Sequence, residues 1–291
     1  MQQRSQLNQP FRQWQWVGVL SSLLVITSGT VSQARNYGSV QLLMGTPSSS
    51  PDGTNRDDYL LIKRQYATSY NNSKGTPNWV SWQLNASWLG PVDRCSGFSP
   101  DPTLPADFKR VVTTDYTGSG FSRGHMTRSG DRTANTTDNC ATFYTTNIVP
   151  QTQDNNEGPW LELENLSREL AIAGKELYII AGPLGEGGKG LKGPMTKIGK
   201  NEVAVPERLW KIVVVLDKPG LGVRGVTKTT RVIAVNMPNI TGIKNKHYTE
   251  YLTTVADLEK LTGYNFLSDV PTEIQAVIEA KTDTTETKTD P

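Results

Sequence analysis

The order of strand-like and helical segments is what most constrains the fold of this chain. Apolar and β-prone residues run through 59–70 and 78–89, and turn residues at 71–75 between them predict an antiparallel hairpin. Because strands and helices alternate irregularly, the sequence predicts an α+β fold with a mixed or antiparallel sheet core rather than a doubly wound sheet. The remaining elements are expected as strands at 141–149, 176–181, 209–216 and 231–235, and as helices at 160–173 and 248–261.

Loops are expected wherever glycine, proline or unpatterned polar residues accumulate. These segments are 94–106, 116–120, 127–139 and 182–200. The helix at 160–173 has the clearest periodicity of the chain, and Gly174 follows it as a stop signal.

The first 34 residues have the composition of a secretory signal peptide. Arg4 and Arg12 precede an apolar stretch at 16–27 that is too short for a membrane span, and Ser32-Gln33-Ala34 is a small-x-small cleavage site. We expect the mature chain to be secreted or periplasmic and free of the membrane. An uncleaved anchor is the alternative.

The remainder of the chain divides by composition. Residues 35–56 predict an irregular segment that Leu42 and Leu43 attach to the domain. Residues 57–270 predict the folded domain. Residues 271–291 are rich in Thr, Asp, Glu and Lys and predict a disordered tail that follows a short helix.

Net charge gives no general affinity for polyanions. The formal charge is +2, and residues 1–34 contain two arginines and no acidic residue, so the mature chain is neutral. Any binding of a polyanion must therefore depend on local clusters of Arg and Lys.

Cys95 and Cys140 are the two cysteines of the chain. In an exported protein such a pair predicts one disulfide, and two buried free thiols are the alternative. The bridge would close a long loop, hold the Arg94 loop beside the candidate site, and stabilise the fold by roughly 3–4 kcal/mol.

The stretch Ser122-Arg123-Gly124-His125-Met126 combines groups that suit phosphate chemistry. An imidazole can take up a proton near neutral pH, and a guanidinium matches the geometry of a phosphate. Gly124 lets the backbone bend or approach a ligand closely. A hydrogen-bonded core histidine is the alternative reading of His125.

A second set of polar residues recurs at four-residue steps. Asn156, Trp160, Glu164 and Arg168 are predicted on one helix face, with Asn156 at or just before the helix start. Two ordinary interpretations compete with a functional one. Glu164 and Arg168 could form a surface ion pair, and Asn156 could simply open the helix.

Distance assigns different roles to the two oxygen donors. Asn156 and Glu164 lie about 12 Å apart along an ideal helix axis, which is too far for both to touch one small ion. Mg²⁺ keeps several waters and takes one or two protein oxygens. Our hypothesis is that Asn156 binds the ion directly, that Glu164 acts through bound water, and that Arg168 faces the scissile phosphate.

Taken together, these motifs resemble the DNA/RNA non-specific endonuclease family, whose active site is a ββα-metal (His-Me) finger. The resemblance extends over about 57–267 and is strongest to exported cyanobacterial sugar-non-specific nucleases. The motifs that carry it, in chain order, are Ser122 to Met126, Asp131-Arg132, Thr142 to Gln151, and Asn156-x3-Trp160-x2-Leu163-Glu164-x3-Arg168.

The resemblance implies a role for each site residue. His125 would be the general base, Asn156 the protein ligand of one Mg²⁺ or Mn²⁺, and Glu164 the holder of the metal's water shell. The substrates would be single- and double-stranded DNA and RNA, and the products would carry 5′-phosphates. Three arginines would bind phosphate and stabilise the transition state: Arg168, Arg123 and Arg94.

One position departs from the family pattern. Ser122 stands where the motif usually has Asp, so a charged partner that could raise the basicity of His125 is absent there. An attenuated or silenced nucleic-acid-binding protein is therefore the main alternative. A structural protein and a sequence-specific nuclease are the others.

Two further expectations concern partners and assembly. An exported nuclease would endanger its own cell before export, so we expect an intracellular protein inhibitor. The nuclease is expected to be a monomer. His247, close to Lys244 and Lys246, is expected in a solvated or phosphate-contacting loop rather than in catalysis.

Overall fold

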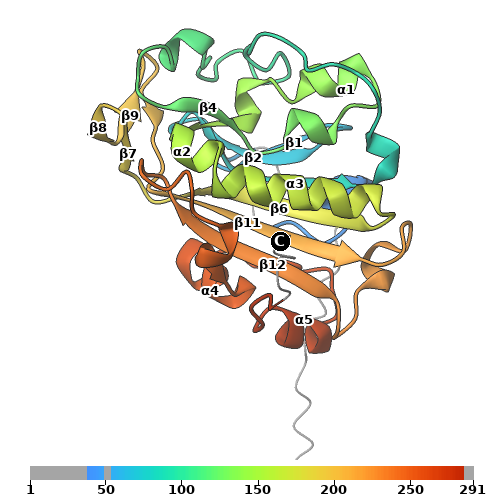
Figure 1. Ribbon diagram of the computed structural model, residues 1–291. Coiled ribbons are helices and arrows are strands. Elements are labelled where there is room, and N and C mark those ends of the chain that lie inside the picture. Colours follow the sequence, from blue (N-terminus) through green and yellow to red (C-terminus); the bar gives the residue numbers. More distant parts are fainter. Residues whose placement is uncertain (1–37, 49–53, 285–291) are drawn as a thin grey trace, which may run out of the picture. The chain divides into compact units, whose positions relative to one another are not determined.

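A seven-stranded antiparallel sheet forms the centre of the fold in the computed structural model, which describes residues 38–48 and 54–284 (Figure 1). Every neighbouring pair in this sheet is antiparallel. The sheet confirms the expected α+β class. Its strands, in spatial order, are β1 (Tyr59–Ile62), β2 (Ala67–Asn71), β3 (Thr76–Leu84), β6 (Glu176–Leu184), β11 (Arg208–Leu216), β12 (Arg231–Pro238) and β13 (Leu252–Thr253).

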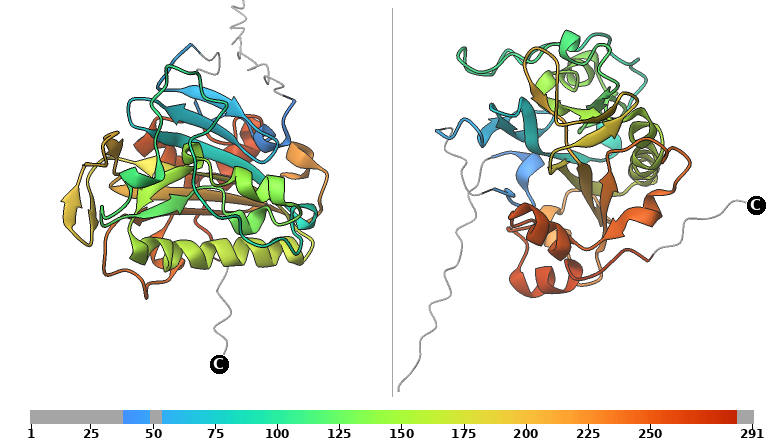
Figure 2. Two further views of the ribbon diagram at one scale, coloured as in Figure 1. Left: turned by 90° about the horizontal axis from the view of Figure 1, so that it is seen from above. Right: turned by 90° about the vertical axis from the view of Figure 1, so that its left-hand side faces the viewer.

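Helices cover both faces of this sheet. Helix α3 (Pro159–Ile172) lies along one face, whereas α4 (Val255–Thr262) and α5 (Thr272–Ile278) lie on the other (Figures 1 and 2). Side chains alternate along a strand, so each face has its own core. On β6, Ile179 belongs to the α3-side core and Ile180 to the opposite one.

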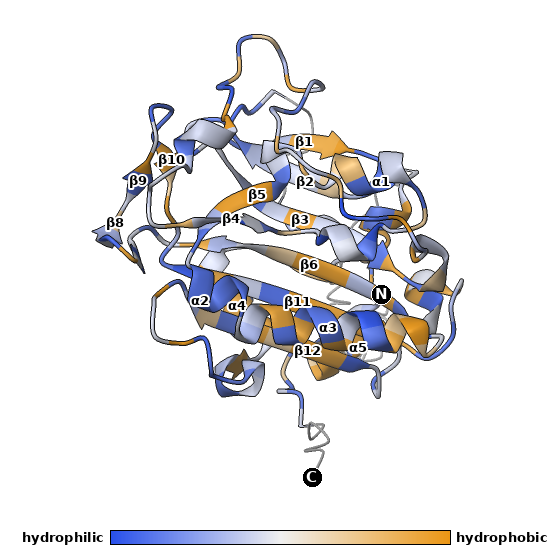
Figure 3. Ribbon diagram, turned by 45° about the horizontal axis from the view of Figure 1, so that its top comes forward, coloured by the Kyte–Doolittle hydropathy of each residue, from blue (hydrophilic) through white to orange (hydrophobic). Residues whose placement is uncertain are grey.

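Hydropathy follows the same layering. The central strands β6, β11 and β12 are largely apolar, whereas α3 carries both apolar and polar residues along its length (Figure 3). Lys211 is the exception on β11, because it lies on the α3 side between the apolar Leu209 and Val213 and is 1% exposed. A lysine at such a depth requires a nearby opposite charge.

A separate two-stranded ribbon carries the histidine motif. Strand β4 (Ser122–His125) pairs with β5 (Ile148–Gln151), with His125 opposite Ile148. The chain then continues into α2 (Gln153–Asn156) and α3. The histidine therefore lies on a ββα unit beside the main sheet.

Several expected elements are confirmed, although their bounds differ. The turn at 71–75 joins β2 and β3 in an antiparallel hairpin. The expected strand at 59–70 is in fact two strands, β1 and β2, which form a further hairpin. Helix α3 and strands β6, β11 and β12 lie where the apolar patterns predict them.

The expectation of a loop at 127–139 followed by a strand at 141–149 was wrong. Helix α1 (Thr136–Ala141) occupies the middle of this stretch, a single 3-10 turn follows, and only Ile148–Gln151 is a strand. The Asn135 side chain accepts a hydrogen bond from the Asp138 amide and starts α1. A short capped helix of six residues shows no apolar period in the sequence.

The helix expected at 248–261 was also wrong in its first half. Residues Tyr248–Tyr251 form a 3-10 turn, and Leu252–Thr253 adds β13 to the edge of the sheet. Helix α4 starts only after Thr254, whose side chain accepts from the Asp257 amide. The loop expected at 182–200 contains the end of β6 and three short strands, β7 (Gly188–Gly190), β8 (Gly193–Met195) and β9 (Lys197–Ile198), the last paired with β10 (Val203–Ala204).

The terminal segments correct two further expectations. Leu42 is buried as expected, but Leu43 is 39% exposed. The short helix expected before the tail is α5, which buries Ile278, and Asp283 beyond it pairs with Arg231 at 2.8 Å, so ordered structure continues well past residue 271. The expected signal peptide, residues 1–34, lies outside the described residues, as do 285–291. Within the described ranges, no helix has the length and apolar character needed to cross a membrane.

Candidate active site

His125 lies at the end of β4 in an aromatic pocket. Its ring centroid is 5.3 Å from that of Phe98 and 4.9 Å from that of Phe143, and the residue is 8% exposed. Nε2 is buried without a hydrogen-bond partner. Burial, with the positive charges of Arg94 and Arg128, lowers the pKa of His125 to about 3. The imidazole is therefore neutral at pH 7 and can accept a proton.

The ribbon fixes where this histidine lies. A Cβ on Gly124 would stand 2.6 Å from the Cβ of Gln151, so only glycine fits against the neighbouring strand. Just after His125, Asn147 receives two hydrogen bonds, from the Met126 amide at 2.9 Å and the Thr127 amide at 2.9 Å. Asn147 thus holds the end of β4, a role that the sequence motifs did not reveal.

The turn at 128–130, directly after the histidine motif, brings three arginines together. Arg94 donates to the Ser129 hydroxyl at 2.9 Å, and Arg168 of α3 donates to the Gly130 carbonyl. Arg128 is the third arginine, and its charge acts on both His125 and Arg94. Residues from three distant parts of the sequence therefore place guanidinium groups around one turn.

Glu164 of α3 lies between two other cations. Its carboxylate is 3.6 Å from Arg128 Nε and 3.7 Å from Lys211 Nζ, and the residue is 9% exposed. Lys211 Nζ also lies 3.9 Å from the Trp160 ring centroid. Burial raises the pKa of Glu164, and the charges of Lys211 and Arg128 oppose that shift. Among the described residues Glu164 does not pair with Arg168, so the simple surface ion pair is excluded.

Asn156 lies just before the helix that carries Glu164, as expected, but it belongs to a separate helix rather than to one face of α3. It ends α2, which Thr152 caps, and Gly158 interrupts the helical path with φ −110° and ψ −118° before Pro159 starts α3. Proline disfavours a helical conformation for the residue before it. Trp160, Glu164 and Arg168 do share α3. The Asn156 side chain is half-buried and has no hydrogen-bond partner in the described part of the chain.

Arg123 points toward a different set of contacts. It donates to the Thr113 carbonyl at 2.8 Å and to the Thr117 hydroxyl at 3.2 Å. Its guanidinium carbon lies 5.7 Å from the Phe98 ring centroid, and Phe98 also contacts His125. Arg123 and His125 therefore flank the same aromatic ring, with Arg123 held by loop atoms.

The disulfide between Cys95 and Cys140 is present and ties the Arg94 loop to α1. The Cys95 amide also donates to Asn139 Oδ1 at 2.7 Å. Arg94 lies 4.8 Å from the Phe143 ring centroid, so it contacts the aromatic ring that packs on His125. The bridge thus fixes one arginine of the site.

Comparisons with known proteins bear on the family to which the chain belongs. The family model for DNA/RNA non-specific endonuclease matches residues 47–273. The chain belongs to the DNA/RNA non-specific endonuclease family. It is 54% identical over 246 residues to a nuclease of Nostoc sp., covering 84% of this chain and 86% of that protein.

More distant relatives share the domain. Nuclease EXOG, mitochondrial, of Xenopus laevis is 35% identical over 222 residues, which span 74% of this chain and 58% of that protein. Among solved structures, a chain of the crystal structure of the EndoG/EndoGI complex superposes with a TM-score of 0.65 at 26% identity. The match covers 79% of this endonuclease chain and 91% of that one.

The donors available for a metal ion in this endonuclease are few. Within the described ranges, no group of three or more His, Cys, Asp or Glu side chains could enclose an ion. The unbonded amide of Asn156 and the carboxylate of Glu164 are hard oxygen donors of the kind that Mg²⁺ takes while keeping most of its waters. The residues fit a largely hydrated ion and do not fit a fully enclosed one.

Two charged residues of the candidate site were not predicted from the sequence patterns. Arg128 fell in a segment read as an unpatterned loop, and Lys211 interrupts an apolar strand. The lone lysine in Leu209 to Leu216 was the available signal, because a lysine inside a buried strand must find a carboxylate.

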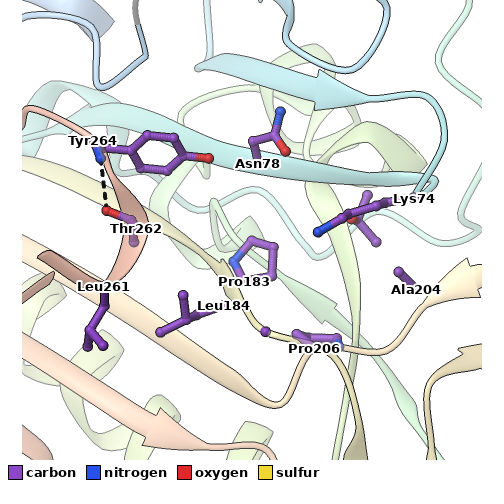
Figure 4. A pocket seen from close by; sticks show the side chains of 11 residues that line it. Lys74, Asn78, Pro183, Leu184, Ala204, Pro206, Leu261, Thr262 and Tyr264 are labelled. Atoms are coloured by element: carbon purple, nitrogen blue, oxygen red, sulfur yellow. Dashed lines mark hydrogen bonds between the residues drawn. The ribbon is translucent and has the colours of Figure 1, made fainter. Parts of the chain in front are cut away.

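The cavity in Figure 4 is unrelated to this chemistry. It has a volume of about 160 Å³ and lies between β3, the end of β6 and the carboxyl-terminal end of α4. Lys74, Asn78, Pro183 and Tyr264 line it, and none of the arginines around His125 reaches it. The candidate site is instead the cluster of arginines around the turn at 128–130.

Proposed function

We propose that this chain is a metal-dependent endonuclease that hydrolyses phosphodiester bonds of single- and double-stranded DNA and RNA and leaves 5′-phosphates. The observation that carries the proposal is a neutral, buried His125 beside a turn on which three arginines converge. A neutral imidazole next to a cluster of guanidinium groups suits proton removal from water beside a bound phosphate.

The imidazole would act through the nitrogen that reaches solvent. Nε2 of His125 is buried, while Nδ1 makes no hydrogen bond in the described residues and is not among the buried unpaired atoms. Nδ1 is therefore the atom that can take a proton from an attacking water. A bound phosphate would offset the charges of Arg94 and Arg128 and so raise the pKa of His125 toward the working pH.

The arginines would supply charge where the phosphate oxygens become more negative. Arg94 and Arg168 are anchored to the 128–130 turn, which fixes them before substrate binds. Arg123 would contribute from the other side of Phe98. Contacts to phosphate carry no base information, so cleavage without sequence preference follows, and binding should weaken with salt.

Asn156 would hold one Mg²⁺ or Mn²⁺ directly, and Glu164 would hold its waters. When bound, such an ion supplies positive charge to the phosphate and the leaving oxygen. Lys211 and Arg128 would keep the Glu164 carboxylate ionised and fixed in place. Asn156 and Glu164 come from separate helices, so the break at Gly158 would set the spacing between the two donors.

The test is digestion of circular DNA and of RNA with Mg²⁺, with and without a chelator. We expect a smear of fragments, full inhibition by chelator, and a loss of at least about 100-fold in His125→Ala. Discrete bands would indicate a sequence-specific nuclease. Unchanged hydrolysis by His125→Ala would rule out the proposed base.

The environment of Ser122 supports one second candidate. Its side chain has no hydrogen-bond partner among the described residues, and no carboxylate contributes to the pKa of His125. A silenced nucleic-acid-binding protein would show binding without cleavage. A Ser122→Asp variant that gains activity while the wild type has a low rate would indicate an attenuated enzyme.

We further propose that the chain is exported to the periplasm or the medium as a monomer after loss of residues 1–34, with 57–270 as the nuclease domain. An intracellular protein inhibitor is proposed because EndoG, a structural relative, is described in complex with EndoGI in a study of EndoG inhibition. Amino-terminal sequencing of the mature protein tests the cleavage site. A pull-down from the producing cell with His125→Ala that recovers no protein would argue against the inhibitor.

A further inference from the structure

Arg128 belongs to neither of the two motifs, yet it occupies the centre of the site. Its Nε lies 3.6 Å from the Glu164 carboxylate, and its Nη1 donates to Asn165 Oδ1 at 2.7 Å. The side chain lies along Gly130, where an added Cβ would be 3.0 Å from Nε. The guanidinium is therefore held in one orientation by three neighbours.

One nitrogen of this guanidinium remains available. Nη2 makes no hydrogen bond within the described residues, is not among the buried unpaired atoms, and belongs to a side chain that is 25% exposed. Arg94 and Arg168 attach to Ser129 and Gly130, whereas Arg128 lies along Gly130 and donates to Asn165 of α3. An anion bound by Arg128 would thus lie beside the one bound by the other two arginines.

The charge of the cluster exceeds what one phosphodiester can neutralise. Two buried carboxylates, Glu164 and Asp131, face a larger number of cations, so the positive charge exceeds the negative charge by more than one unit with His125 neutral. One phosphodiester supplies a single negative charge, so the cluster can also attract a second phosphate. The cations are Arg94, Arg128, Arg132, Arg168 and Lys211.

A groove that could take the next nucleotide is lined by Asn165, the hydrogen-bond partner of Arg128. Leu161 and the 244–247 loop also line this groove, which has a volume of about 360 Å³. Inside this groove Lys244 pairs with Glu157 at 2.8 Å and His247 with Glu162 at 3.1 Å. A groove whose own charges are paired suits a sugar and base, which leaves Arg128 as the cation for the phosphate at its entrance.

We propose that Arg128 binds the phosphate next to the scissile one, so that the site grips two consecutive phosphates of one strand and favours polymers over isolated phosphodiesters. This inference rests on the proposed nuclease function. It assigns Arg128 to substrate binding and separates it from Arg94 and Arg168, which would serve the scissile phosphate.

The first test measures binding without chemistry. A fluorescein-labelled single-stranded 12-mer is titrated in EDTA at several salt concentrations against wild type, Arg128→Gln and Arg224→Gln. Arg224→Gln is the matched control, because Arg224 is an exposed arginine outside the site. We expect Arg128→Gln to bind about 10-fold more weakly and to lower the slope of log affinity against log salt by about 0.7. An unchanged slope would overturn the proposal.

The second test compares substrates that carry one phosphate or many. With Mg²⁺, Arg128→Gln should lower kcat/KM on both substrates, because Arg128 also contacts Glu164, but the loss on the 12-mer should be about 10-fold larger than the loss on bis(p-nitrophenyl) phosphate. Arg128→Lys should recover most of the loss. Equal losses on both substrates would mean that Arg128 acts through Glu164 and would overturn the proposal. A wild type that binds the 12-mer but cleaves neither substrate would refute the proposed function, while the binding test still decides the role of Arg128.

Discussion

Two buried glutamates, one on each side of the central sheet, have opposite surroundings. Glu176, at the start of β6 on the side of α4 and α5, accepts hydrogen bonds from Gln83 at 2.7 Å, Tyr178 at 2.9 Å and Asn85 at 3.1 Å. Glu164, on the α3 side, is held by two cations at 3.6 and 3.7 Å. Short bonds from neutral donors satisfy Glu176, whereas longer ionic contacts leave Glu164 able to bind something else.

The difference teaches how to tell a structural carboxylate from a functional one in this fold. Both residues are deeply buried, so burial alone does not separate them. A carboxylate whose lone pairs are already taken by short hydrogen bonds has little capacity for a ligand. One that is balanced only by nearby charge keeps that capacity, and Glu164 also lies beside the arginines of the site.

The largest expected effect comes from exchanging each glutamate for glutamine. Glu164→Gln should lower kcat on plasmid DNA by about 10²–10³-fold, because it removes the charge that would hold the metal's waters. Glu176→Gln should leave kcat within a few-fold and lower the free energy of unfolding by about 1–3 kcal/mol, because it disturbs a satisfied hydrogen-bond network. Activity assays and urea titrations of both variants measure this. The contrast fails if the two variants lose activity equally.

The free energy of unfolding at acidic pH should depend on His125 of the candidate site. The pKa of His125 is about 3 in the fold and near 6.5 in the unfolded chain, so between these values the unfolded chain binds more protons. Stability should therefore fall as the pH drops from about 6.5 toward 3, by up to about 5 kcal/mol from this group. Urea unfolding of wild type and His125→Asn across this range tests the sign. A variant with the same pH dependence as wild type would contradict it.

Lys211→Met should show how much the fold is destabilised when the buried Glu164 carboxylate loses one of its two cations. It leaves the Glu164 carboxylate with Arg128 alone, and breaking a buried pair costs about 3–5 kcal/mol. The double variant Lys211→Met, Glu164→Leu should regain most of this stability while remaining inactive. Chemical denaturation of the two single variants and the double variant gives the coupling energy. A double variant as unstable as Lys211→Met would argue against the pairing.

Loss of the disulfide should affect the candidate site and leave the surroundings of Glu176 unchanged. Cys95→Ser with Cys140→Ser should lower the free energy of unfolding by about 3 kcal/mol and reduce kcat/KM by releasing the Arg94 loop. Melting curves and plasmid cleavage report the two effects. Hydrogen exchange of the β6 amides near Glu176 serves as the internal control. Unchanged cleavage together with an unchanged melting temperature would contradict a role for the bridge.

Much of the fold was readable from local pattern. The period of α3 and the apolar runs of β6, β11 and β12 predicted those elements, because each is long enough to show its own repeat. The errors fell on short elements. Helix α1 has six residues and β13 has two, so end caps and edge pairing, rather than periodicity, decide them.

The candidate site was only half readable. His125, Asn156, Glu164 and Arg168 were found from their residue types and spacing, and the family comparison supports that the chain is a nuclease. The contact between Arg128 and Glu164 was not predicted, because the sequence of a polar loop does not show which of its cations will lie next to a buried carboxylate. Asn156 was expected at or just before the start of the Glu164 helix, and the separate helix α2 was not predicted, because a glycine followed by a proline can open a helix or separate two.

The sequence alone determined the kind of protein: the α+β class, the order of the long elements, the histidine motif and the family resemblance. Only the tertiary structure decided which charges meet. Glu164 pairs with Arg128 and Lys211 rather than with Arg168, and Arg94 reaches Ser129 across 35 residues of sequence. The physical reason is the sequence distance over which each effect acts. Periodicity and capping act between residues a few positions apart, whereas folding brings together charges from strands, loops and helices that are distant in the chain.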